Sequence, residues 1–159
     1  MKMHDSNTTY GFRIHSLGLL MFFRDVIGLP CGKKYSTLRI PQLFKTDNKL
    51  KISFIRGLAD TDFCISLKRG SRKNPFYPVI SGSSKSKEFM SEIADELEHL
   101  GIHSRRYFDY IMKDTRLSNG FSIINRIEIN RHDNVKRWMQ IIGFKSPKHL
   151  KKAEKASLL

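Results

Sequence analysis

The sequence has little of the features that mark several classes of protein. It has only two cysteines, Cys31 and Cys64, which lie far apart without CxxC or Cys/His spacing, and its six histidines show no metal-ligand spacing. We interpret the cysteines as reduced thiols, not as a disulfide or a zinc site. No apolar run approaches the about 18 residues of a membrane span, and the N-terminus lacks a signal-peptide core. These absences predict a cytoplasmic protein without a membrane partner.

Acidic residues are also scarce. The 159 residues include 29 Lys and Arg against 15 Asp and Glu, which gives a formal net charge of +14 and a pI near 10.0. Such a surplus favours phosphate binding through the release of counterions. Charge alone also fits a ribosomal or other basic protein. A chain of this length with 40% hydrophobic residues is expected to build one core, not two.

Two acidic residues stand at the wrong end of a predicted helix. The apolar pattern from Leu50 to Leu58 predicts a helix. Thr46 or Asp47 can cap its start, and Asp60 and Asp62 lie in its last turn. A helix C-terminus carries partial negative charge, so each acidic group there costs about 0.3–1 kcal/mol. A bound divalent cation is one candidate for the missing compensation.

The same helix carries a stripe of small residues. Ser53, Gly57 and Thr61 fall at i, i+4 and i+8 and therefore share one face. Glycine is a costly choice inside a helix unless another backbone comes close. We therefore predict two such helices packed side by side, each ending in Asp62 near the line of contact.

The remaining periodicity predicts an α+β fold. After the helix come two strands at 63–67 and 76–80, a helix at 85–100 that Ser84 or Ser86 caps and Gly101 stops, two strands at 102–112 and 121–129, and a helix at 133–142. The order is αββαββα. The acidic side chains from Glu92 to Glu98 are expected to form a solvated helix face that points away from any nucleic acid.

Two segments repeat each other 115 positions apart. Ile14, Phe23, Ile27, Gly28 and Lys33 correspond at this offset to Ile129, Trp138, Ile142, Gly143 and Lys148. One strand–helix–Gly–basic unit therefore occurs twice, and the matched register argues against two unrelated glycine-ended helices. We divide the chain into a partial unit at 1–41 that resembles the end of a preceding repeat, an αββαββα domain at 42–147, and a basic C-terminal tail at 148–159.

Residues Ile55 to Phe63 resemble the nine-residue motif of the LAGLIDADG homing endonuclease family. Gly57, Leu58, Asp60 and Asp62 occupy the motif positions, and Phe63 stands where glycine is usual. The resemblance implies a curved antiparallel sheet and motif helices at the interface of two pseudo-symmetric halves. It also implies that the terminal Asp62 binds Mg²⁺, for which Mn²⁺ could substitute, and cuts DNA.

The resemblance also implies a catalytic cation. The family places a lysine after the IGF-x-x-P turn, which here is Lys148, and its repeat mate is Lys33. A plain basic tail is the alternative for Lys148. Ser81 stands where some relatives have a water-orienting polar residue. We assign Asp60, about 200° around the helix from Asp62, to helix-end hydrogen bonding.

Seven polar residues are candidates for contact with DNA. One face of the strand after the motif presents Ser66 and Lys68 and continues to Arg72, as a strand in the major groove requires, although a solvated sheet face would look the same. Arg105, Arg106, Lys113 and Arg116 are candidates for phosphate or guanine contacts.

The leading hypothesis is a site-specific endonuclease of double-stranded DNA that uses Mg²⁺. The alternatives are a non-cleaving protein of the same fold, such as an RNA maturase or a DNA-binding regulator, or one half of a split endonuclease. A single motif requires either a homodimer or a partner chain that carries the first motif. If the host element is an intron, the location could be organellar.

Overall fold

The computed structural model describes residues 2–6, 9–32, 37–70, 76–156 and 158. An N-terminal unit contains the hairpin β1 (Lys2–Ser6) and β2 (Thr9–Arg13), the helix α1 (Leu17–Met21) and the π-helical segment η1 (Phe22–Val26). A 3-10 turn, η2 (Gln42–Phe44), leads into the rest of the chain.

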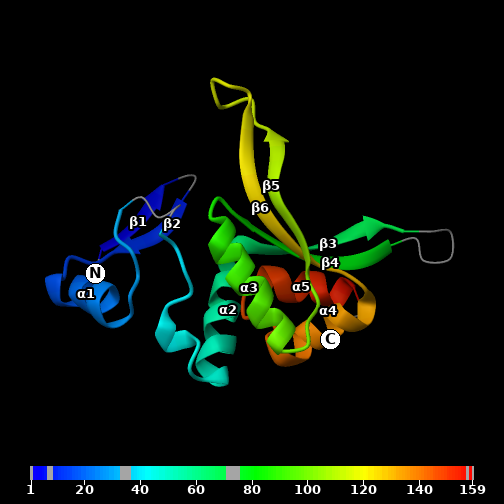
Figure 1. Ribbon diagram of the computed structural model, residues 1–159, viewed down its shortest axis with the longest axis horizontal. Coiled ribbons are helices and arrows are strands. Elements are labelled where there is room, and N and C mark those ends of the chain that lie inside the picture. Colours follow the sequence, from blue (N-terminus) through cyan, green and yellow to red (C-terminus); the bar gives the residue numbers. More distant parts are fainter. Residues whose placement is uncertain (1, 7–8, 33–36, 71–75, 157, 159) are drawn as a thin grey trace.

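The rest is an αββαββα domain followed by one more helix. Its elements are α2 (Asn48–Asp62), β3 (Phe63–Arg69), β4 (Phe76–Ser84), α3 (Lys87–His99), β5 (Arg105–Lys113), β6 (Phe121–Ile129), α4 (His132–Ile141) and α5 (Pro147–Lys155). The four strands form one antiparallel sheet in the order β3-β4-β6-β5. The two hairpins diverge, so the sheet is strongly twisted, and the helices lie together on one side of it (Figure 1). This architecture confirms the predicted α+β fold.

Local sequence signals set the ends of the helices. The side chain of Asp47 accepts hydrogen bonds from Lys49 N and Leu50 N, so Asp47 rather than Thr46 caps α2. Ser86, not Ser84, caps α3 by accepting from Phe89 N. Gly101, with φ +70°, follows the end of α3 in the left-handed conformation that favours glycine.

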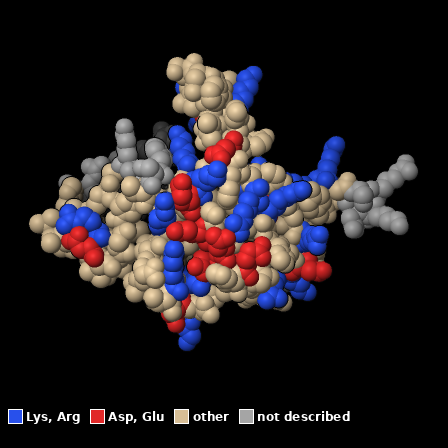
Figure 2. Space-filling view, viewed as in Figure 1, with Lys and Arg blue, Asp and Glu red and all other residues tan. Residues whose placement is uncertain are grey.

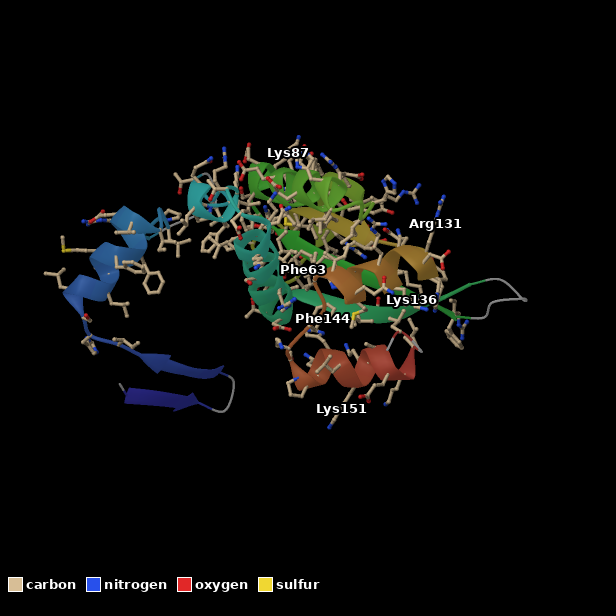
Figure 3. All side chains as sticks on the ribbon, turned by 90° about the horizontal axis from the view of Figure 1, so that it is seen from below. Phe63, Lys87, Arg131, Lys136, Phe144 and Lys151 are labelled. Atoms are coloured by element: carbon tan, nitrogen blue, oxygen red, sulfur yellow. The ribbon has the colours of Figure 1, made fainter. Side chains whose placement is uncertain are left out.

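Phe63 joins the motif helix directly to the sheet. Its backbone is extended, with φ −102° and ψ 164°, so the usual glycine is not needed at this position. The ring packs against Trp138 with centroids 5.9 Å apart, and it lies so close to Gly82 that a Cβ there would overlap it. Phe63 therefore helps to fix the sheet against α4 (Figure 3).

Acidic side chains gather over helix α3, on the side of the sheet that the helices cover (Figure 2). These residues are not simply solvated. Glu96 pairs with Lys51 at 2.7 Å, Glu92 with Lys45 at 3.3 Å and Asp95 with Arg106 at 2.8 Å. The acidic face therefore ties the start of α2 and strand β5 to α3.

The C-terminal segment is a packed helix, which corrects our expectation of a separate basic tail from residue 148. Helix α5 buries His149 and Ala153, one turn apart, and Leu158 joins the same core. The lysines occupy the remaining faces, as Lys151 shows by pointing outward in Figure 3. The high lysine content hid a narrow apolar stripe that is sufficient to hold the helix.

The N-terminal unit repeats the shape of β6 and α4. Segment α1–η1 runs from Leu17 to Val26, and α4 spans the residues that lie 115 positions later. Gly28 (φ +80°) and Gly143 (φ +66°) follow the two helices in the same conformation. The packing differs, however, because the unit lies apart from the domain and the apolar side chains of α1 and η1 are exposed (Figures 1 and 3).

Among the residues described, no helix is long and apolar enough to cross a membrane.

Candidate active site and nucleic-acid interface

Asp62 is the last residue of α2 and is exposed to solvent. Its carboxylate contacts the Thr61 hydroxyl at 3.3 Å and forms no ion pair with any residue in the described part of the chain. The position is electrostatically unfavourable because the helix C-terminus is also negative. An exposed oxygen donor in this place fits a hard divalent cation such as Mg²⁺. The described ranges contain no cluster of three or more His, Cys, Asp or Glu residues that could hold a metal.

The small-residue stripe of α2 is open. Ser53, Gly57 and Thr61 are all exposed, whereas Ile55 and Ala59 on the opposite side of the helix are fully buried in the core. A Cβ added to Gly57 would meet no atom of the described residues within 4 Å. The core of this chain therefore does not explain the glycine.

Asp60 has a structural role. Its carboxylate accepts hydrogen bonds from Lys145 N at 3.0 Å and Ser146 N at 3.0 Å. These bonds satisfy backbone donors at the entrance to α5, where Ser146 itself supplies no side-chain cap. The prediction of helix-end hydrogen bonding is confirmed, although the helix end belongs to α5 and not to α2.

The Asp60 bonds bring the first turn of α5 to the same end of the domain as Asp62. Lys148 lies on that turn and is exposed. A cation therefore stands on the element that is anchored beside the motif. Ser81 of β4 is paired with Cys64, two residues after Asp62, and the two side chains are 3.4 Å apart. Lys33, the repeat mate of Lys148, lies outside the described residues.

His149 is a buried histidine under this anchor. Its ring packs on Phe144 with centroids 4.7 Å apart, and its Nδ1 atom has no hydrogen-bond partner among the residues that the structure describes. Burial lowers the pKa of His149, the charges of Lys152 and Lys148 lower it further, and Asp60 opposes this effect. The folded state therefore favours the neutral ring.

Acidification is expected to destabilise the fold through His149. The folded pKa lies below 6.5, so the unfolded chain binds more protons, and the free energy of unfolding should fall as the pH falls from about 6.5 toward the folded pKa. Urea titrations between pH 7.5 and 5 would measure this. His149→Phe, which keeps an aromatic ring on Phe144, should flatten the pH dependence. An equally steep decline in His149→Phe would mean that another group is responsible.

The face of the sheet that points away from the helices, here called the outer face, carries three of the residues predicted to contact DNA. Ser66 and Lys68 lie on it in β3, because Phe63 and Ile65 point into the core. Arg105 lies on it in β5, with its guanidinium 5.8 Å from the Tyr107 ring centroid. These three residues share one surface.

The other predicted contacts are placed differently. Arg106 points to the helix side of the sheet and pairs with Asp95. Lys113 is exposed at the far end of β5. Arg116 lies in the β5–β6 turn and pairs with Asp114 at 2.8 Å, and this hydrogen-bonded partner lowers the pKa of Asp114 to about 2. Arg72 lies outside the described residues.

Two charged residues on the outer face were missed from the sequence. Arg126 and Glu128 alternate with the buried Ile127 and Ile129 in β6 and so belong to the same face as Lys68. The strict alternation of residues 126–129 was the signal that could have identified them.

Three features define the class of protein: an αββαββα unit, an exposed stripe of small residues on its first helix, and a carboxylate at the end of that helix. Residues 49–143 match the family described as LAGLIDADG-like domain, which is more than half of the chain. The chain therefore belongs to the LAGLIDADG family of homing endonucleases and maturases. No curated protein matches the chain.

Proposed function

We propose that this chain is a site-specific endonuclease of double-stranded DNA that acts when its motif helix is paired with a second one. The observation that supports this best is the exposed Asp62 at the end of α2, beside the unoccupied stripe of Ser53, Gly57 and Thr61. One chain offers one such carboxylate. Pairing through the stripe would bring a second carboxylate to the first, which is what a metal-dependent cut of two strands requires.

The chain's own residues take separate roles in this proposal. Asp62 would hold Mg²⁺, with the Thr61 carbonyl as a further oxygen donor. The chemistry that the ion supplies when bound is stabilisation of negative charge at the scissile phosphate. Lys148, on the turn that Asp60 anchors, would supply the positive charge that stabilises negative charge developing on the phosphate. The outer sheet face, with Ser66, Lys68 and Arg105, would lie against the DNA.

The exposed apolar side chains of α1–η1 indicate that this segment packs against a further part of the assembly. Phe23 is 44% exposed, whereas its repeat mate Trp138 is fully buried; Leu20 and Val135 show the same contrast. In the second repeat these positions are covered by the core of the αββα segment, residues 48–99. We therefore propose that the exposed apolar face of α1–η1 packs against a further αββα segment that carries its own motif helix.

Relaxation of supercoiled plasmid DNA tests the enzymatic proposal. The purified chain, alone and with Mg²⁺ or Mn²⁺ at low salt, should nick or linearise plasmids that carry its site, and EDTA should stop the reaction. Salt-dependent binding of duplex DNA without any metal-dependent cut would favour the second candidate, a non-cleaving nucleic-acid-binding protein.

Gly57→Leu is expected to abolish pairing through α2. A leucine would fill the position of the stripe with the smallest side chain, where a second backbone can approach most closely, so a paired species should become monomeric by light scattering. Gly57→Ala is the control: it should stabilise the isolated chain by about 0.5–1 kcal/mol, because nothing lies within 4 Å of the new methyl group. A wild-type dimer unaffected by Gly57→Leu would place the contact elsewhere. A stable wild-type monomer would mean that a second copy of this chain does not supply the second motif helix.

A further inference from the structure

Glu128 is a buried carboxylate on the outer face of the sheet, which also carries Lys68, Arg105 and Arg126. Its side chain is only 5% exposed. It accepts two hydrogen bonds from Lys68 Nζ, at 2.7 and 2.9 Å, and another from the guanidinium of Arg126. Lys68 and Arg126 remain partly open to solvent, with about a third of each side chain exposed. The three residues form a triad with one acidic centre and two cations.

The triad crosses the central strands of the sheet. Lys68 belongs to β3 and Glu128 to β6, and β4 lies between them. Their positions are level with Tyr77 and Ser81 of β4, so the bridge passes over Val79. Val79 lies on this outer face by alternation and yet has no exposed surface. The register places the bridge from Lys68 to Glu128 over Val79, as this burial requires.

A buried carboxylate is costly on a surface that binds DNA. It repels phosphates and cancels one of two positive charges at the middle of the face. In return, the carboxylate orders the surface, because its charge-assisted hydrogen bonds fix the flexible side chains of Lys68 and Arg126 in one geometry. Fixed donors are what base readout requires, whereas phosphate contacts tolerate mobile ones.

We propose that Glu128 is a specificity-determining positioning residue: it holds Lys68 and Arg126 so that their remaining donors read base edges in the major groove. This inference rests on the proposed function, since it requires that the outer face binds duplex DNA. Glu128 touches neither the scissile phosphate nor the metal in this arrangement, and it acts through the two cations.

Glu128→Gln separates positioning from a general structural role. The variant gains one unit of positive charge and releases Lys68 and Arg126 toward solvent. Binding to unselected duplex DNA should become several-fold tighter, and the slope of log K against log salt should steepen by up to about 0.9 for each new phosphate contact. Base preference should weaken at the contacted positions, by about tenfold or more for each position lost. A purely structural role would instead weaken both kinds of binding.

The experiment selects binding sites from a randomised duplex pool and then compares selected with unselected duplexes by fluorescence anisotropy. Glu88→Gln is the charge-matched control, because Glu88 lies on α3 on the other side of the sheet. Lys68→Met is the second variant, since its unbranched side chain still covers Val79. It should lose the same base preferences without tighter binding to unselected DNA. Melting curves confirm that each variant is folded.

Each outcome decides between the two proposals. A wild-type preference that Glu128→Gln and Lys68→Met lose at the same positions, and that Glu88→Gln keeps, supports the inference. Unchanged preferences in a folded Glu128→Gln or Lys68→Met protein overturn it while leaving the proposed function intact. If the wild-type chain shows no salt-dependent binding of duplex DNA, the proposed function fails, and the inference fails with it.

Discussion

Asp62→Asn should abolish metal-dependent DNA cleavage while leaving DNA binding unchanged or slightly tighter. Asparagine keeps the size of the side chain and one oxygen, but it loses the negative charge that holds a divalent cation. A loss of at least about 3 kcal/mol of transition-state stabilisation, or more than about a hundredfold in rate, is expected. Binding should not weaken, because the change removes a negative charge that would repel nearby phosphates.

Plasmid cleavage with Mg²⁺, measured beside anisotropy on the same DNA, checks this expectation. Asp60→Asn is the matched control on the same helix. Its amide oxygen can still accept from the Lys145 and Ser146 backbone, so we expect a modest loss of stability and continued cleavage. Cleavage at the wild-type rate by Asp62→Asn would remove Asp62 from the metal site. Loss of cleavage in a folded Asp60→Asn protein would give Asp60 a part in the reaction.

The helices and strands of the domain could be predicted because their signals are local. Helix α3 has a serine cap, an apolar face of period 3.6 and a glycine stop within about fifteen residues, and each of these signals acts on its own neighbours. The same holds for α2 and for the alternation in β3. The order αββαββα follows from these elements without knowledge of how they pack.

The candidate site could be predicted only where one element carries it. Asp62 and the stripe on α2 belong to a single helix, so spacing places them. Asp60 binds backbone groups 85 and 86 residues away, and Lys68 meets Glu128 across a strand order that the sequence does not encode locally. The alternation of a strand likewise places Arg105 and Arg106 on opposite sides of the sheet. Only the position of α3 in the fold decides that Arg106 is the one that pairs with it.

The strongest test of the repeat compares equivalent positions in its two copies. Trp138→Ala removes a fully buried ring that packs on Phe63 and Phe144, and it should cost about 3–5 kcal/mol. That is a large fraction of the about 5–15 kcal/mol that stabilises a typical domain. Phe23→Ala changes the matching position in the N-terminal unit, where the ring is half exposed, and should stay within about 0.5 kcal/mol in the isolated chain.

Urea unfolding of both variants measures this contrast. A second pair of smaller substitutions covers the case in which Trp138→Ala does not fold. Ile142→Val should cost about 0.5–1.5 kcal/mol, whereas Ile27→Val at the matching, half-buried position should cost less. Equal losses at Phe23 and Trp138 would show that the N-terminal unit is already covered within a single chain or by a second copy. Unequal losses that become equal when a partner polypeptide with a motif helix is added would identify that partner as the cover. The apolar face of α1–η1 would then be the part of a preceding repeat that this chain contributes.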